Sequence, residues 1–110
     1  MSHLIENNDI TLTRGDTLIL NLNLTKNGEP FTPEEGSTIR FAMKRKYTDP
    51  DEDALVIDIP IDALILEIEP EDTKHLAQKK TYVYDIQLTE PDGRVDTFIS
   101  GKFRISEEVL

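Results

Sequence analysis

The sequence predicts an all-β fold, an antiparallel β-sandwich of about seven strands, and three observations support this fold class. From Ile10 to Ile105, apolar residues recur at every second position, the period of strands that bury one face. Turn-forming residues interrupt this alternation about every 8 to 12 residues. Neither the length nor the spacing of any apolar segment favours a long helix that could connect parallel strands. A small barrel is the alternative architecture.

The first two strands are predicted on either side of a glycine-containing turn. Asp9–Thr13 places Ile10 and Leu12 on one face. The segment Arg14–Asp16 also matches a short peptide that integrins recognise, but a strand connection needs glycine there, so we interpret it as a turn. Thr17–Leu24 is the second strand, because its four leucines occupy alternate positions and can all point inward. An Asn-Gly pair then predicts a tight turn.

Three further strands are predicted in the middle of the chain. Residues 39–44 form the third, in which three apolar residues alternate with Arg40, Ala42 and Lys44. Leu55–Ile59 is the fourth, and the proline that follows must end or bend it. Apolar residues at every second position from 64 to 68 predict the fifth.

A helical turn near residues 71–76 is predicted to lead to the last two strands, with Asp72 or Thr73 as its cap. Tyr82–Leu88 is the sixth strand, and a Pro-Asp-Gly hairpin joins it to the seventh. The seventh strand is predicted to point four apolar residues inward: Val95, Ile99, Phe103 and Ile105. Gly101 shares this inward row, which predicts a bulge or the close approach of a neighbour.

Length and composition predict one domain, residues 1–110, with residues 1–8 and 106–110 frayed. The formal net charge of -10 opposes binding to nucleic acid or to anionic lipid. Without cysteine, the chain cannot form disulfides or use a thiolate. The N-terminus lacks the pattern of a secretory signal peptide, and no apolar run is long enough to span a membrane. We therefore expect synthesis in the cytoplasm.

No set of residues predicts catalysis or a cofactor. His3 and His75 are the two histidines, and neither is placed beside a nucleophile or an orienting group, so we expect no enzyme activity. Asp49, Asp51 and Asp53 imitate the start of a calcium-binding loop, but the glycine and glutamate that such a loop needs are missing. A solvated strand connection is the expectation, and a weak divalent-ion site remains open.

Several apolar residues have the parity of solvent-facing positions and are candidates for a protein interface. The strand assignment places three of them on the outer face of one sheet and three on the other: Ala42, Val83 and Phe98, then Ile19, Val56 and Ile65. On the first face, Asp85 is expected to pair across strands with the basic residues around it. Single exposed apolar residues are also common in monomers, which is the alternative.

Four segments together resemble a known family: Ile10–Thr17, Thr38–Lys44, Tyr82–Leu88 and Asp92–Arg94. They resemble small immunoglobulin-like domains of tailed bacteriophages and prophages, and in particular the N-terminal domain of the phage baseplate upper protein family. The resemblance implies an immunoglobulin-like strand order. It also implies a structural part of a virion, in a tail, baseplate or head accessory position.

The sequence therefore leads to two functional hypotheses of different classes. The first is a non-enzymatic assembly domain of a virion, made in the bacterial host, that contacts other virion proteins or copies of itself, with a homo-oligomer as one form. The second is a carbohydrate-binding β-sandwich module, for which Tyr47 is the aromatic residue placed in a loop.

Overall fold

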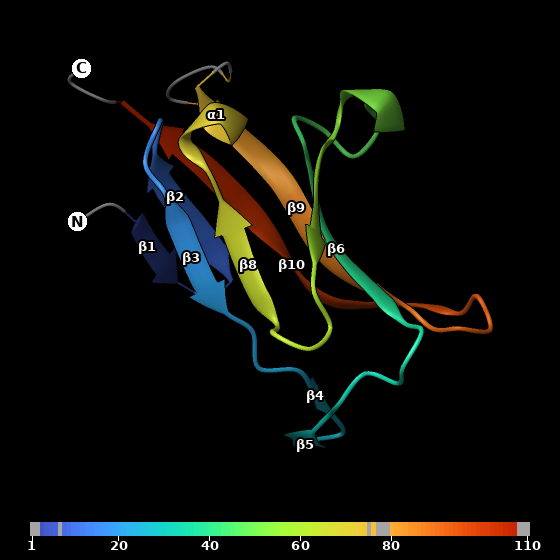
Figure 1. Ribbon diagram of the computed structural model, residues 1–110. Helices are drawn as coiled ribbons and strands as arrows, with labels where there is room; N and C mark the ends of the chain where they lie inside the picture. The colour runs from blue at the N-terminus through green and yellow to red at the C-terminus, as the bar shows by residue number, and fades with distance from the viewer. Residues whose placement is uncertain (1–2, 7, 75, 77–79, 108–110) are drawn as a thin grey trace.

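The computed structural model describes residues 3–6, 8–74, 76 and 80–107, and this part of the chain is all-β with two short helical turns. Figure 1 shows the strands in two layers. The strands are β1 (His3–Glu6), β2 (Asp9–Thr13), β3 (Leu18–Asn21), β4 (Thr25–Lys26), β5 (Glu29–Pro30), β6 (Thr38–Lys44), β7 (Leu55–Ile59), β8 (Ile65–Ile68), β9 (Lys80–Thr89) and β10 (Val95–Ser106). The helical turns are η1 (Asp51–Asp53) and α1 (Pro70–Thr73).

One large sheet has the strand order β1-β2-β10-β9-β6-β7. Its neighbours are antiparallel except β2 and β10, which run parallel with Ile10 opposite Phe103. The second layer is the antiparallel pair β3 and β8, which Figure 1 shows in front of the large sheet. A short ladder of β4 and β5 closes over Asn27 and Gly28, whose positive φ angles of 53° and 80° suit the predicted Asn-Gly turn.

The core lies between the two layers and is built by the predicted inward rows. The fully buried large side chains come from both sheets: Leu12, Leu18, Phe41, Leu66, Ile68, Leu88, Phe103 and Ile105. The ring of Phe41 lies 5.5 Å from that of Tyr84 and 6.0 Å from that of Phe103, centroid to centroid. The two-residue period therefore predicted the all-β class and most of the core correctly.

The prediction of about seven strands is too low, because β1, β4 and β5 are additional. The expectation that residues 1–8 and 106–110 are frayed is wrong for His3–Glu6 and for Ser106. The first segment pairs with β2, and Ser106 lies in β10 opposite Thr13. Composition did not indicate this pairing, since polar residues separate the segment from the next strand.

The predicted second strand is too long. β3 ends at Asn21, opposite Ile65, because its partner β8 begins at that residue. The preceding Leu64 has a φ of 51°, a left-handed conformation that interrupts the ladder. Leu22 and Leu24 remain buried all the same, so the leucine alternation predicted burial better than it predicted hydrogen bonding.

β10 also departs from simple alternation. The register against β9 shifts between Thr97 and Ile99, which is a β-bulge. Because the bulge reverses the parity of the residues before it, Val95 is 54% exposed and the prediction that it points inward is wrong. Phe98 packs against the core and stacks on Phe31 with 5.5 Å between ring centroids.

The helical turn lies slightly earlier than predicted, at Pro70–Thr73, and its N-cap residue is Glu69. Asp72 Oδ2 accepts a hydrogen bond from the Glu69 backbone N–H at 2.8 Å. Asp72, one of the two predicted capping residues, therefore contributes to the cap from the third helical position and is not the N-cap residue itself. His75 lies outside the described residues.

Candidate functional site

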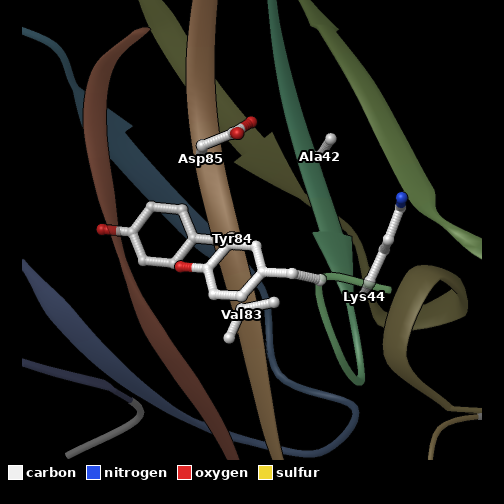
Figure 2. Close-up of a pocket in the computed structure, with 6 residues that line it drawn as sticks. Ala42, Lys44, Val83, Tyr84 and Asp85 are labelled. Carbon is white, nitrogen blue, oxygen red and sulfur yellow. The ribbon is translucent and has the colours of Figure 1, made fainter. Parts of the chain in front are cut away.

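The outer face of the large sheet, where β6, β7 and β9 lie side by side, contains two shallow hollows. The smaller, about 80 Å³, is lined by residues of β6 and β9 and by the loop residue Tyr47. Figure 2 shows Ala42 and Lys44 on β6, with Val83 and Asp85 on β9. Register pairs Ala42 with Asp85 and Lys44 with Val83, so the predicted placement of Ala42 and Val83 on one outer face is confirmed.

The second hollow, about 380 Å³, extends the same surface towards β7. It is lined by Arg40, Ala42, Lys44, Asp51, Ala54, Val56, Asp85 and Gln87. Val56 is 46% exposed and lies directly opposite Ala42. The prediction that Val56 belongs to the other sheet is therefore wrong, because β7 pairs with β6. We name Ala42, Val56 and Val83 the outer apolar patch.

Phe98 was predicted on this face and is not there. At the bulge of β10 its ring is half-buried and turned to Phe31 and the core. The remaining two candidates, Ile19 and Ile65, lie on the outer face of the small sheet as predicted. Ile19 is 58% exposed opposite Glu67, and the half-buried Ile65 is opposite Asn21.

The acidic loop before β7 is held by a lysine. Lys44 Nζ donates hydrogen bonds to the backbone oxygen of Asp49, at 3.0 Å, and to Asp51 Oδ1. Through that hydrogen bond and its positive charge, Lys44 lowers the pKa of Asp51 below its ordinary value of 3.8. The described residues contain no group of three or more acidic or histidine side chains placed to hold a metal ion. The Lys44 ammonium group thus contacts two of the three aspartates of the calcium-like pattern, Asp49 and Asp51.

The same contact corrects the predicted charge pairing around Asp85. Lys44 turns to Asp51, while Asp85 Oδ2 accepts a hydrogen bond of 3.4 Å from Gln87 Nε2 on its own strand. Among the described residues no ion pair joins Asp85 to a basic residue of a neighbouring strand, so the expected cross-strand pairing is wrong. The sequence did not show that Asp51 of the loop comes within reach of Lys44 in the folded chain.

The turn at Arg14–Asp16 is built into the fold. Gly15 has a φ of 85°, and its backbone N–H donates to the hydroxyl of buried Thr73 at 3.0 Å. Arg14 Nη1 donates to the backbone oxygen of Leu76 at 3.4 Å. These contacts join the turn to α1, and they agree with its interpretation as a strand connection.

Tyr84 is a buried titratable residue that also lines the smaller hollow. Burial, with a smaller effect from the negative charge of Asp9, raises its pKa from 10.0 to about 12. Its hydroxyl donates a hydrogen bond to the backbone oxygen of Asn8. This phenol is thus a structural donor that stays protonated at neutral pH.

The arrangement as a whole provides shallow surfaces that other molecules can contact. None of the described helices is long and apolar enough to cross a membrane. A scan of the chain against protein-family models and a search of curated proteins both give no match.

Proposed function

We propose that this chain is a structural or assembly domain of a tailed-phage or prophage virion, a tail, baseplate or head accessory component with an immunoglobulin-like fold. The strand order supports the fold assignment. In immunoglobulin-like domains the second strand pairs with the fifth in one sheet, and the seventh, sixth and third follow one another in the other. Here β3 pairs with β8, and β10, β9, β6 and β7 are successive neighbours.

The outer apolar patch is the observation that carries the assembly role. Val56 is exposed, and half-buried Ala42 lies opposite it on β6. Half-buried Val83 follows on β9, opposite Lys44, so charged residues of β6 and β9 border the patch. A small apolar centre within a polar rim is the usual composition of a protein interface. The partners are other virion proteins or further copies of this chain.

Incorporation into particles tests this proposal. Virions released by the host strain that carries the gene are purified and analysed by mass spectrometry, and we expect the chain in them at a fixed ratio to the major structural proteins. Val83→Asp is expected to reduce incorporation at least tenfold while the circular dichroism spectrum is unchanged. Val83→Thr, a gentler change in a strand, covers the case in which the aspartate variant does not fold.

Thr97→Asp is the matched control, because Thr97 is exposed and faces outward on β10 opposite Gln87. It adds the same charge away from the outer apolar patch and is expected to leave incorporation unchanged. Purified virions without the chain would overturn the proposal.

A carbohydrate-binding module is the second candidate, and one observation favours it. Tyr47 is 70% exposed and lines the smaller hollow together with Lys44 and Asp85, so an aromatic ring lies beside polar side chains that can bind hydroxyl groups. Binding on a glycan array that is lost in Tyr47→Ala would support this function. Absence of binding to any glycan on the array would count against it.

A further inference from the structure

Two dipeptides in the chain place asparagine or aspartate directly before glycine, Asn27-Gly28 and Asp92-Gly93. Such pairs are chemically reactive, because the backbone nitrogen of the second residue can attack the side-chain carbonyl carbon of the first and close a five-membered ring. Glycine favours this attack, since it has no Cβ to block the approach. The two pairs have different surroundings in the structure.

The Asp92-Gly93 pair is held by hydrogen bonds on both sides. Asp92 Oδ1 accepts a hydrogen bond from the Arg94 backbone N–H at 3.0 Å, and Oδ2 pairs with Arg94 Nε at 3.0 Å. The Gly93 N–H donates to the backbone oxygen of Glu90 at 2.9 Å. The backbone N–H of Arg94, followed by its positive charge, lowers the pKa of Asp92 below its ordinary value of 3.8. The side chain is therefore a carboxylate at neutral pH, which is a poor target for a nucleophile.

The Asn27-Gly28 pair has none of these contacts. Both residues are exposed at the tip of the hairpin of β4 and β5, which Figure 1 shows at one end of the molecule. Within the described part of the chain, neither the Asn27 side chain nor the Gly28 N–H has a hydrogen-bond partner. Nothing lies within 4 Å of the position that a Cβ of Gly28 would take. The reacting amide is thus neutral, unbound and uncrowded.

The hairpin can also open at its tip without disturbing the core. Its ladder has only two residue pairs, and all four residues are exposed. A ladder this short has little stability of its own. Next to it, the Phe31 N–H donates to the backbone oxygen of buried Leu24 at 2.9 Å, which anchors the base of the hairpin. The rotation that brings Asn27 Cγ to the Gly28 nitrogen therefore needs only local opening.

We propose that Asn27 is a site of spontaneous covalent modification, at which the folded chain converts asparagine to isoaspartate and aspartate. The Gly28 nitrogen forms a bond to Asn27 Cγ, the Cγ–Nδ2 bond breaks, and ammonia leaves with the proton of the Gly28 N–H. Water then opens the resulting succinimide ring. Attack at the former backbone carbonyl leaves the chain running through Cγ, which is isoaspartate, and attack at Cγ leaves aspartate. Each conversion consumes a water molecule and releases ammonia.

The products change the surroundings of Lys26. Both add a negative charge beside this residue, whose Nζ lies 3.9 Å from Asp96 Oδ2 and 5.5 Å from the centroid of the Phe31 ring. Isoaspartate also adds a methylene group to the backbone of a two-residue turn, which disturbs its register. We therefore expect the Phe31 N–H to exchange faster in the isoaspartate form, while amides of the core strands stay protected.

Peptide mapping by mass spectrometry after incubation of the purified chain tests the proposal. Position 27 should gain the mass of an amide-to-acid conversion at least tenfold faster than Asn21 and Asn23, which both precede leucine. An isoaspartate methyltransferase should label the peptide that contains position 27 and leave the peptide that contains Asp92 unlabelled. The rate should rise with pH, because the reactive form of the Gly28 nitrogen is the deprotonated one.

A synthetic peptide of residues 24–31 gives the reference rate without the fold. We expect Asn27 in the folded chain to react within tenfold of this rate. A folded chain that reacts more slowly than that, or no faster at Asn27 than at Asn21, would overturn the proposal, because the turn would then protect the amide.

Two variants separate the chemistry from the charge. Gly28→Ala should slow the reaction at least tenfold in the peptide and in the folded chain, because the added Cβ crowds the attacking nitrogen. Asn27→Asp carries the charge of the products on an unaltered backbone and should keep slow exchange at Phe31. Fast exchange in Asn27→Asp would assign the change at Phe31 to the charge and not to the longer backbone.

The modification is independent of the proposed assembly role. Absence of the chain from virions would remove that role and leave the reaction at Asn27 as it is. An unreactive Asn27 would leave the incorporation experiment unaffected.

Discussion

Gly101 and Tyr84 together seat the turn before β2 on the inner face of the large sheet. The Tyr84 hydroxyl donates to the backbone oxygen of Asn8, which has a φ of 69°. A Cβ at position 101 would overlap that oxygen and would lie 3.2 Å from Cε1 of Tyr84. The close approach predicted at Gly101 is therefore confirmed, and it explains why a glycine interrupts the inward row.

Gly101→Ala should destabilise the protein by about 1–3 kcal/mol, because the carbonyl of Asn8 is backbone and cannot move without disturbing the turn. Urea unfolding monitored by circular dichroism measures the change. Ser100→Ala, at the exposed neighbouring position, should alter the free energy of unfolding by no more than about 0.5 kcal/mol. Equal stability of wild type and Gly101→Ala would show that the turn moves freely.

The raised pKa of Tyr84 predicts that the folded protein loses stability at alkaline pH. Since its pKa is raised to about 12 in the folded protein, the folded state keeps the phenol proton to a higher pH than the unfolded chain, whose tyrosines titrate near 10. This contribution to stability is complete below pH 10 and is lost as the pH rises towards 12. Tyr84→Phe should be less stable than wild type at pH 8, by about 1 kcal/mol for the lost hydrogen bond.

The difference between wild type and Tyr84→Phe should shrink as the pH rises from 10 to 12, which urea unfolding at a series of pH values measures. Tyr47→Phe is the control, because Tyr47 is 70% exposed and its removal should leave the pH dependence as in wild type. A constant difference across this range would contradict the assigned role of Tyr84.

At the scale of elements, α1 and the turn at Arg14–Asp16 support each other across the end of the sandwich. Buried Thr73 accepts the Gly15 N–H and donates, at 3.5 Å, to the Pro70 carbonyl. A four-residue helical turn has little stability of its own, so this tertiary contact holds it in place.

Thr73→Val should cost about 1–3 kcal/mol, because the isosteric side chain leaves the Gly15 N–H without its partner. Amide hydrogen exchange at Gly15 should accelerate in Thr73→Val and remain slow in Thr73→Ser, which keeps the hydroxyl. Equally fast exchange in both variants would mean that the methyl group, rather than the hydroxyl, holds the turn.

For the strands, the sequence predicted which residues are buried better than it predicted which strands pair. The alternation of apolar residues predicted the buried rows, because in a strand that buries one face every second side chain points into the core. It assigned Val56 to the wrong sheet, since the partner of a strand depends on pairing that its own residues do not encode. It missed the turning of Phe98, because a bulge shifts the register without a sequence signal as strong as glycine or proline.

The candidate site was predictable only in part for the same reason. Ala42 and Val83 follow from parity within two strands that had been recognised. The second hollow could not be predicted, because it depends on the pairing of β7 with β6, which brings Val56 opposite Ala42. The acidic loop was visible, but the hydrogen bonds from Lys44 needed the folded position of η1.

For the whole molecule, the concentration of negative charge in residues 47–73, which hold ten acidic residues and no lysine or arginine, should make stability depend on salt. Raising NaCl from about 0.05 to 0.5 M screens the repulsion within residues 47–73, since the screening length falls from above 10 Å to a few Å. The urea midpoint of the wild type should rise. The rise should be smaller in Asp58→Lys than in Glu34→Lys, and an identical rise in both variants would contradict a localised origin.

The parallel pairing of β2 with β10 has a consequence for synthesis on the ribosome. The side chains of Thr13 and Ser106, 93 residues apart in the chain, form a hydrogen bond. During synthesis β2 therefore cannot pair with β10 until nearly every other strand has been made. Until then Ile10 and Leu12 lack their neighbours Phe103 and Ile105 in the sheet, and a nascent polypeptide stalled before Val95 would expose more of them to chaperones or to neighbouring nascent chains.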